Sequence, residues 1–133
     1  MKPGIESAVG YVDVIVTPDM SATLDGHEIH PVYSTFWAGY HCEVAARRAI
    51  EPYFEDGENA VGSGLSINHR AMAAIGARLT VTAKVSSISG NRIVCTVEVR
   101  TLESRILLAE GTQEQVVLPT VRLQELVKHA VVT

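Results

Sequence analysis

The chain has 133 residues with 47% hydrophobic side chains, enough for a packed core of about one domain. Its formal net charge is −4 and its eleven Lys and Arg residues are scattered, so no basic patch predicts binding to nucleic acid or to an anionic membrane. No apolar run approaches the roughly 18 residues of a membrane span, and the first residues lack the apolar segment of a signal peptide. We therefore expect one domain over residues 1–133, located in the cytoplasm.

The two cysteines, Cys42 and Cys95, lack the CxxC spacing of zinc and redox sites. We predict that both are reduced, buried thiols, because free cysteine is among the most buried residue types. His27 and His30 offer metal-binding side chains in an expected loop, but no third ligand lies nearby in the sequence. The sequence therefore gives no reason to expect a metal ion or a cofactor.

The first half of the chain predicts one strand and one long helix. Residues 11–16 form a β-rich run closed by a Pro-Asp turn signal, and we expect a polar loop over residues 20–30. The helix is expected within residues 34–53 and should end near Pro52, since proline disfavours the helical conformation of the residue before it. Thr35 lies near the helix start, where a threonine oxygen often caps free amides.

The second half alternates polar and apolar residues with period two, which is typical of half-buried strands. We expect strands over residues 60–68, 78–85, 92–100 and 105–118. Ser89-Gly90-Asn91 predicts a tight hairpin between the second and third of these, and Gly111 suggests a bulge in the last. A short helix over residues 121–129 should follow Pro119. The predicted fold class is α+β, with an antiparallel sheet wrapped around a helix.

Glu43 is the most unusual residue of the predicted helix. On a period of 3.6 residues it shares a stripe with Gly39, Ala46 and Ile50, which predicts that its carboxylate lies on the apolar face. A carboxylate in such a place is a candidate general base or nucleophile. The structural alternative is an ion pair with Arg47, one helical turn later.

Thr35, Glu43 and His69 together supply a hydroxyl, a carboxylate and an imidazole, the groups that acyl-transfer chemistry uses. His69 ends the strand expected at residues 60–68, so a rigid sheet would aim its ring. The alternatives are a simple helix cap for Thr35 and a strand-end histidine with only a structural role for His69. His41 and Cys42 are poorly placed to act as a pair, since adjacent helix residues point about 100° apart.

The local sequence around these residues resembles the fluoroacetyl-CoA thioesterase family, whose members have the hot-dog fold. The matching residues are Ser34-Thr35, Glu43-Val44-Ala45, Arg48-Ala49, Pro52-Tyr53, Glu55, Gly57-Glu58, Gly62, His69 and Gly76, without a gap from Thr35 to Gly76. The resemblance runs from roughly Val14 to Leu118. It places the family's catalytic threonine, glutamate and histidine on Thr35, Glu43 and His69, and its active-site glycine on Gly62.

The resemblance has two departures. The region that carries lid phenylalanines in fluoroacetyl-specific members reads Gly26-His27-Glu28-Ile29-His30 here, and Gln115 replaces an arginine of the late strand. We therefore expect a relative that acts on another small or medium acyl thioester, carried by coenzyme A or by a carrier protein.

The resemblance also implies a homodimer with active sites at the interface, as in hot-dog domains generally. Eight helical residues advance the axis by about 12 Å, so Thr35 and Glu43 cannot touch within one regular helix. Either the helix start is irregular or the partner subunit contributes. In the implied mechanism Glu43 attacks the thioester or activates water, His69 moves protons, and Thr35 orients the carboxylate or the acyl oxygen. Helix-start amides near Gly39 would stabilise the oxyanion, and Gly62 would leave room for the substrate.

Two other functions compete with thioester hydrolysis. One is a non-catalytic hot-dog module that binds or protects an acyl-CoA, which the lost lid and lost arginine keep open. The other is a hydratase-type hot-dog enzyme, but it would need an Asp and a His near the start of the helix, and the sequence offers no pair there that fits as well.

Overall fold

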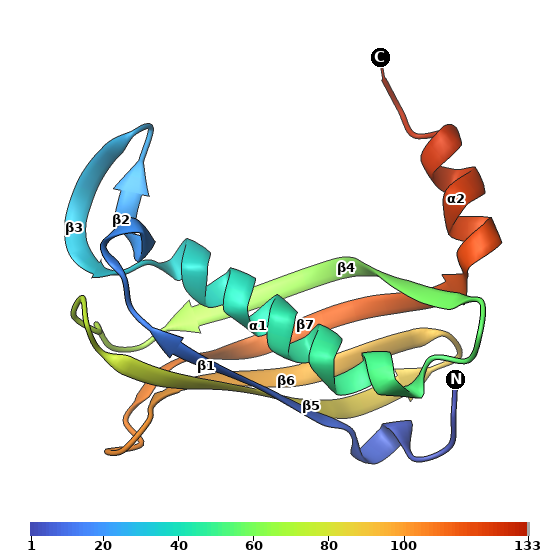
Figure 1. The fold of residues 1–133 in the computed structure, drawn as a ribbon, viewed down its shortest axis with the longest axis horizontal. Helices are drawn as coiled ribbons and strands as arrows, with labels where there is room; N and C mark the ends of the chain where they lie inside the picture. Colours follow the sequence, from blue (N-terminus) through green and yellow to red (C-terminus); the bar gives the residue numbers. More distant parts are fainter. Residues whose placement is uncertain (133) are drawn as a thin grey trace.

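An antiparallel five-stranded sheet curls around one long helix in the computed structural model, which describes residues 1–132 (Figure 1). The strands are β1 (Val9–Ile15), β4 (Glu58–His69), β5 (Arg78–Ser89), β6 (Arg92–Thr101) and β7 (Leu107–Pro119), in the order β1-β5-β6-β7-β4. The helix α1 (Thr35–Ile50) lies across the concave face. The predicted α+β class with a sheet around a central helix is confirmed.

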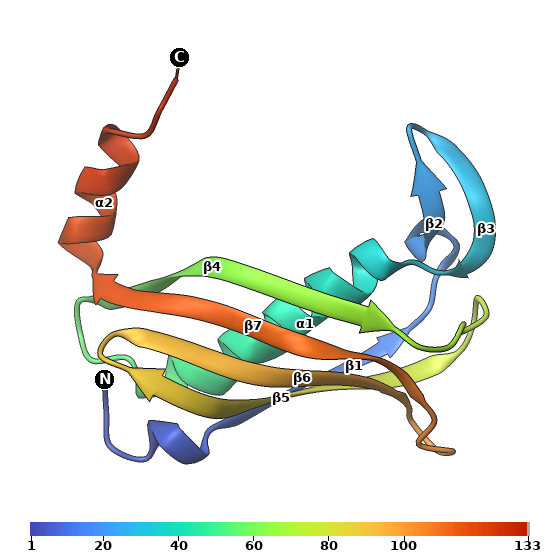
Figure 2. The same ribbon diagram turned by 180° about the vertical axis from the view of Figure 1, so that it is seen from behind.

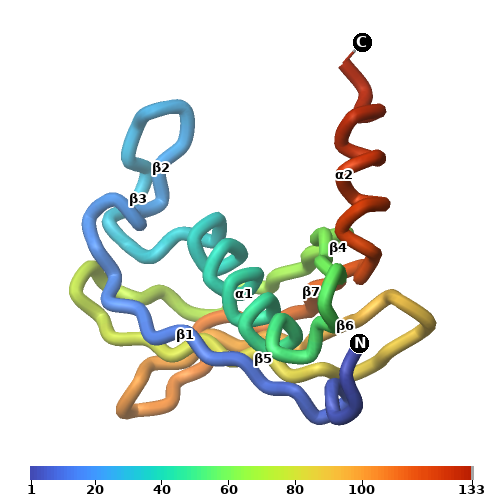
Figure 3. The backbone as a smooth tube through the Cα atoms, turned by 45° about the vertical axis from the view of Figure 1, so that its right-hand side comes forward, coloured from blue at the N-terminus to red at the C-terminus, as the bar shows by residue number. Residues whose placement is uncertain are grey.

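Smaller elements complete the chain. A two-stranded hairpin, β2 (Ser21–Leu24) and β3 (His27–Tyr33), leads into α1, and the short helix α2 (Thr120–Lys128) follows β7. Three 3-10 turns occupy Ile5–Ser7, Pro18–Met20 and Glu51–Tyr53. Figure 3 shows the hairpin and α2 rising on the same side of the sheet as α1, at its two ends.

The core lies between α1 and the sheet. The helix presents small side chains to it, and Ala38, Cys42, Ala45 and Ala46 are all fully buried. Small residues let a strand approach closely: at Gly10 of β1, an added Cβ would collide with the carbonyl oxygen of Ala45. The sheet contributes alternate residues, which are Leu79, Val81 and Ala83 of β5 and Ile93, Cys95, Val97 and Val99 of β6. This is the predicted period-two pattern.

Local signals account for the ends of α1. Ser34 is the N-cap, and its hydroxyl accepts a hydrogen bond of 3.1 Å from the amide of Trp37. This satisfies one of the free amides of the first turn. The helix ends at Ile50, and Pro52 lies in the 3-10 turn that follows, as the sequence predicts. The predicted hairpin between β5 and β6 is also present, with Gly90 at φ 63°.

Two sequence predictions are wrong. The segment expected to be a polar loop over residues 20–30 contains the hairpin β2–β3, turned by Asp25 and Gly26 with φ of 52° and 78°. Gly111 is not a bulge: the β4–β7 register shifts instead between Gly62 and Gly64. Gly111 is required because an added Cβ would collide with the carbonyl oxygen of Ser66 on the neighbouring strand.

The sheet has two free edges, β1 and β4 (Figure 2). Residues 61–66 of β4 are exposed, and among them Val61 and Leu65 are 47% and 45% exposed. Phe36 and Tyr40 of α1, which line one cleft together with Leu65, are 78% and 52% exposed. An open strand edge with apolar neighbours is a surface that proteins usually cover.

Among the helices of residues 1–132, none combines the length and apolar character needed to cross a membrane.

Candidate active site

A hydrogen bond joins two of the three predicted catalytic residues. Thr35 Oγ1 lies 2.9 Å from His69 Nδ1. Thr35 is the first residue of α1 and His69 is the last residue of β4, so the helix start and a strand end bring together residues 34 positions apart. Both side chains are held by regular elements.

The hydroxyl of Thr35 does not cap the helix. The capping oxygen belongs to Ser34, whose hydroxyl accepts from Trp37 and whose carbonyl accepts from Ala38 at 3.0 Å. The capping alternative for Thr35 is therefore wrong. Its hydroxyl instead forms a hydrogen bond with His69, whose imidazole can accept or donate a proton.

His69 is half-buried, and its two ring nitrogens differ in environment. Nδ1 contacts the Thr35 hydroxyl, whereas Nε2 is buried and has no hydrogen-bond partner within residues 1–132. A buried ring nitrogen without a partner costs free energy, so such atoms in native proteins call for an explanation, which at catalytic positions is often a proton-transfer role. One ring nitrogen of His69 thus has a hydrogen-bond partner, and the other is free to bond to another group.

Glu43 lies on the same helix, but its predicted burial is wrong. Its side chain is exposed in this chain, although Gly39, Ala46 and Ile50 of the same stripe are buried. The reason is that Glu43 sits at the margin of the buried arc, beside the free edge of β4. The alternative pairing with Arg47 is also absent, because Arg47 instead donates to Glu51 at 2.7 Å and to Asn59 at 2.6 Å.

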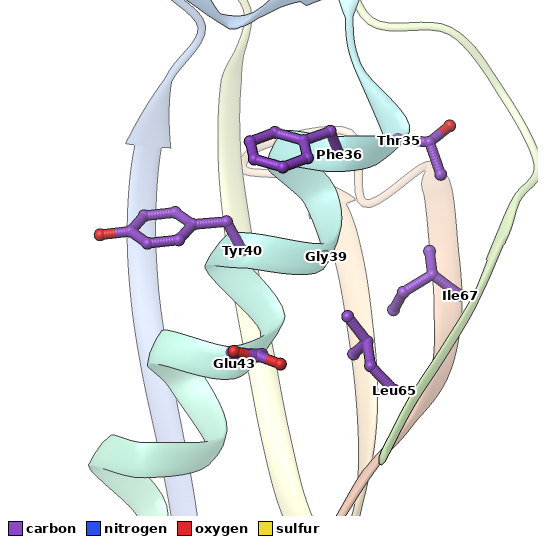
Figure 4. A pocket seen from close by; sticks show the side chains of 7 residues that line it. All are labelled: Thr35, Phe36, Gly39, Tyr40, Glu43, Leu65 and Ile67. Atoms are coloured by element: carbon purple, nitrogen blue, oxygen red, sulfur yellow. The ribbon is translucent and has the colours of Figure 1, made fainter. Parts of the chain in front are cut away.

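A cleft of about 510 Å³ runs along α1 from Thr35 to Glu43. Its lining comes from α1 and β4 only: Thr35, Phe36, Gly39, Tyr40, Glu43, Leu65 and Ile67. In Figure 4 the Glu43 carboxylate lies about two helical turns from Thr35, with Leu65 and Ile67 on the facing strand. The cleft is thus apolar between two polar ends, a common character of sites for small organic ligands.

The two predicted glycines both adjoin this cleft. Gly39 lines it, and an added Cβ there would lie 3.1 Å from Leu65 Cδ2. Gly62 faces the carboxylate end, since an added Cβ would lie 3.9 Å from Glu43 Oε1 and 3.6 Å from Gln113 Nε2. Both glycines therefore leave space at the cleft, as the family resemblance implies for Gly62.

Gly39 does not supply a free amide, however. It is the fifth residue of a regular helix, where the amide bonds to the carbonyl four residues earlier. The amides of Thr35 and Phe36 come before this pattern begins and are the ones available at the helix start. An oxyanion near this end of the cleft would meet those two amides rather than that of Gly39.

The structure adds two buried glutamines of β7 that the sequence analysis did not predict as a pair. Gln113 and Gln115 are each 3% exposed, and Gln113 Oε1 and Gln115 Nε2 have no hydrogen-bond partner within residues 1–132. Gln115, the residue at the family's arginine position, pairs in register with Gly62. The signal available in the sequence was the period-two alternation over residues 113, 115 and 117, which puts both amides on the same face as the buried Val117.

The remaining candidates do not form a second reactive site. Cys42 and Cys95 are free and buried, as predicted, and burial raises their thiol pKa values to about 12 and about 11. His27 and His30 lie on β3, and no cluster of three metal-type side chains occurs within residues 1–132.

Comparison with known protein families identifies the chain. The family model described as fluoroacetyl-CoA-specific thioesterase matches residues 16–121. The chain belongs to this family. The fluoroacetyl-CoA-specific thioesterase family consists of thioester hydrolases, and this protein is a thioester hydrolase. Among curated protein sequences none matches this chain.

Solved structures agree with the family assignment. A Thermus thermophilus hypothetical protein, a thioesterase superfamily member, is 35% identical with a TM-score of 0.91, over 97% of this chain and 94% of that one. The fluoroacetyl-CoA thioesterase itself is 24% identical with a TM-score of 0.81, over 95% of this chain and 96% of that one. A hot-dog-like protein from Thermanaerovibrio acidaminovorans is 22% identical with a TM-score of 0.83, over 96% and 92%. The predicted hot-dog fold is confirmed.

Proposed function

We propose that this protein is an acyl-CoA thioesterase for a small or medium acyl group, with Thr35, Glu43 and His69 as its catalytic set. The observation that carries the proposal is the hydrogen bond of 2.9 Å between Thr35 and His69 at one end of a cleft whose other end is Glu43. A solved variant of the related fluoroacetyl-CoA enzyme holds acetyl-CoA, which supports a coenzyme A thioester as the substrate class.

The reaction follows from the chemistry of the three groups. The Glu43 carboxylate attacks the thioester carbonyl to give a mixed anhydride, or it removes a proton from the water that attacks. The carbon–sulfur bond breaks, and His69 gives a proton to the departing thiolate. Water then releases the acid if an anhydride has formed. Thr35 holds the imidazole in place through Nδ1, and the amides at the helix start stabilise the oxyanion.

One chain does not bring these groups together. Thr35 and Glu43 are eight residues apart in a regular helix, a separation of about 12 Å along its axis. Glu43 lies beside Gly62, which is seven residues from His69 on β4, or about 23 Å of extended strand. An irregular helix start, the first of the two options, is ruled out because Thr35 is already helical. This supports the second option, in which a partner subunit contributes to the site.

We therefore include a homodimer through the β4 edges in the proposal. A two-fold axis that pairs this edge with its own copy makes the two strands antiparallel. The His69 end of one β4 then approaches the Gly62 half of the other. Each site would combine Thr35 and His69 of one subunit with Glu43 of its partner, and the unpaired Nε2 of His69 would gain a polar neighbour. The exposed Val61 and Leu65 would become buried.

The acyl specificity is expected to differ from that for fluoroacetyl. The residues that replace the family's phenylalanine lid, Gly26 to His30, lie on an exposed hairpin. Of these only Ile29 is a large hydrophobic side chain, and it is 51% exposed. A cleft without the phenylalanine lid admits water and larger acyl groups.

The two free thiols, Cys42 and Cys95, support a cytoplasmic location, because free cysteines are typical of reducing compartments.

A thiol-release assay over a panel of acyl-CoA thioesters tests the proposal. Glu43→Gln and His69→Ala should each lower kcat at least about 100-fold while melting temperatures stay near that of the wild type. Glu103→Gln makes the same charge change at an exposed loop residue and should leave kcat unchanged. Release that is equal in the wild type and in Glu43→Gln would contradict the catalytic set, and binding without turnover would indicate the protective module instead.

A further inference from the structure

Tyr33 lies between the two segments that carry Thr35 and His69. It is the last residue of β3, is 1% exposed, and precedes Thr35 by two positions. Its amide donates to the carbonyl of Ala73 at 2.9 Å, and Val32 forms a bridge with Ala74. The end of β3 is thereby tied to the segment that follows His69. These contacts fix the backbone position of Tyr33.

The hydroxyl of Tyr33 is clamped to α1. It lies 2.7 Å from Nδ1 of His41, and the two rings are nearly parallel, with centroids 5.8 Å apart and planes 13° apart. Burial raises the pKa of Tyr33 and lowers that of His41, and both shifts favour the neutral forms of the two groups. A tyrosine hydroxyl both donates and accepts, so it satisfies Nδ1 in either neutral tautomer of His41. The ring of Tyr33 is therefore held at its far end as well as at its backbone.

The same ring packs against the imidazole of His69. Their centroids are 6.5 Å apart and their planes lie at 78°, an edge-to-face arrangement. Within residues 1–132, the His69 ring has one hydrogen bond, to the hydroxyl of Thr35, and Thr35 itself is exposed. The Thr35 hydroxyl sets the direction of one ring nitrogen, and the buried Tyr33 packs against the ring itself. The rigid neighbour of His69 is Tyr33.

We propose that Tyr33, clamped by His41, is a positioning residue that holds the His69 imidazole in the orientation that presents Nδ1 to Thr35. This inference rests on the proposed function, because it assigns His69 a catalytic role. Misplacement of a catalytic group by about 1 Å can cost about 100-fold in rate, so a fixed ring behind His69 has a direct kinetic value. Tyr33 acts through His69 and does not itself touch the substrate.

The alternative is that Tyr33 is only a core residue. In that case removal of its hydroxyl leaves His41 Nδ1 without its Tyr33 partner and lowers the melting temperature, but the folded fraction keeps its turnover rate. A positioning residue predicts a different result, in which kcat falls while KM changes little. The split between kcat and KM separates the two roles.

The test compares Tyr33→Phe, Tyr33→Leu and the control Tyr53→Phe. Tyr53 is half-buried in the turn after α1, at the end of the helix away from Thr35. We expect kcat per folded protein to fall about threefold in Tyr33→Phe, which keeps the ring, and about 30-fold or more in Tyr33→Leu. KM should stay within about twofold of the wild type, and Tyr53→Phe should match the wild type. If Tyr33→Leu does not fold, kcat of Tyr33→Phe alone tests the positioning role.

A kcat for folded Tyr33→Phe equal to that of Tyr53→Phe, or a change confined to KM, would overturn the inference. A measurement that does not depend on turnover separates failure of the positioning role of Tyr33 from failure of the proposed function. Nitrogen-15 NMR of the His69 ring, assigned with His69→Ala, reports its tautomer. If the wild type hydrolyses no thioester, the proposed function fails; an altered His69 tautomer in Tyr33→Phe alone would still support positioning by Tyr33, and an unaltered one would refute it.

Discussion

The hydroxyl of Thr35 and Nδ1 of His69 lie 2.9 Å apart and connect the first residue of α1 with the last residue of β4. The neighbouring Ser34 caps the helix in place of Thr35. Adjacent hydroxyls thus have separate tasks, one for the stability of the helix and one for the orientation of an imidazole. This division makes the two residues a matched pair for mutagenesis.

Ser34→Ala should lower the free energy of unfolding by about 1 kcal/mol, the usual cost of a lost N-cap, with kcat of the folded protein nearly unchanged. Thr35→Ala should lower kcat and leave the free energy of unfolding nearly unchanged. It removes one hydrogen bond at the site, and a loss of about 1.4 kcal/mol corresponds to about tenfold in kcat. Urea unfolding and the thiol-release assay measure the two effects. Lost stability with normal turnover in Thr35→Ala would show that its hydroxyl has only a structural role.

Gly62→Ala tests whether the space beside Glu43 is used by substrate. The added Cβ would lie at ordinary contact distance, 3.6 Å from Gln113 Nε2 and 3.9 Å from Glu43 Oε1, so the chain should fold. Turnover should nevertheless fall by about tenfold or more, because the methyl group occupies the cleft next to the carboxylate. The matched change Gly111→Ala meets backbone of β4 and should unfold the protein. Normal kinetics in Gly62→Ala would remove Gly62 from the site.

Much of the fold was predictable because its signals are local. The alternation of β5 and β6, the turn at Gly90 and the stop at Pro52 depend on neighbours in sequence, and the structure bears them out. The hairpin β2–β3 was missed because most of its residues are exposed, so no alternation of polar and apolar residues marks it. Asp25-Gly26 was the signal available there, since this dipeptide favours a hairpin turn.

The site was harder to predict because it depends on which faces remain uncovered. Helical periodicity placed Glu43 on the buried stripe, but the adjacent sheet edge is open and leaves its carboxylate exposed. No local pattern reports that β4 is an edge strand. The partnership of Tyr33 with His41 and His69 was likewise invisible, because it joins three separate elements.

The two thiols should respond to pH in a defined direction. Their folded pKa values of about 12 for Cys42 and about 11 for Cys95 lie above the value of about 8.5 for an exposed thiol. The contribution of the protonated thiols to stability is therefore fully present below about pH 8.5 and is lost as pH rises from there toward 11, by about 1.4 kcal/mol per pH unit for each thiol. Urea unfolding at pH 8 and pH 10 measures the loss, and Cys95→Val should reduce it. Rapid labelling of both native thiols at pH 8 would contradict their burial.

The specificity prediction concerns the exposed hairpin. Because Gly26 to His30 cannot form an aromatic lid and Gln115 replaces an arginine, this protein should not strongly prefer fluoroacetyl-CoA to acetyl-CoA. Its preferred substrate should be another small or medium acyl thioester. The ratio of kcat/KM for the two thioesters measures this. A preference of about 1000-fold for the fluorinated substrate, some 4 kcal/mol in transition-state binding, would show that the hairpin provides an enclosure after all.

The central claim is a thioesterase site built from Thr35 and His69 of one subunit and Glu43 of its partner. Co-expression of Glu43→Gln and His69→Ala chains with different tags tests it, since each homodimer alone should be inactive. Random pairing makes half of the dimers mixed, each with one intact site, so the mixture should recover about a quarter of wild-type thioester hydrolysis. Purified mixed dimers should reach about half. Mixed dimers as inactive as their parents would contradict the shared site, and a monomer in light scattering would contradict the dimer itself.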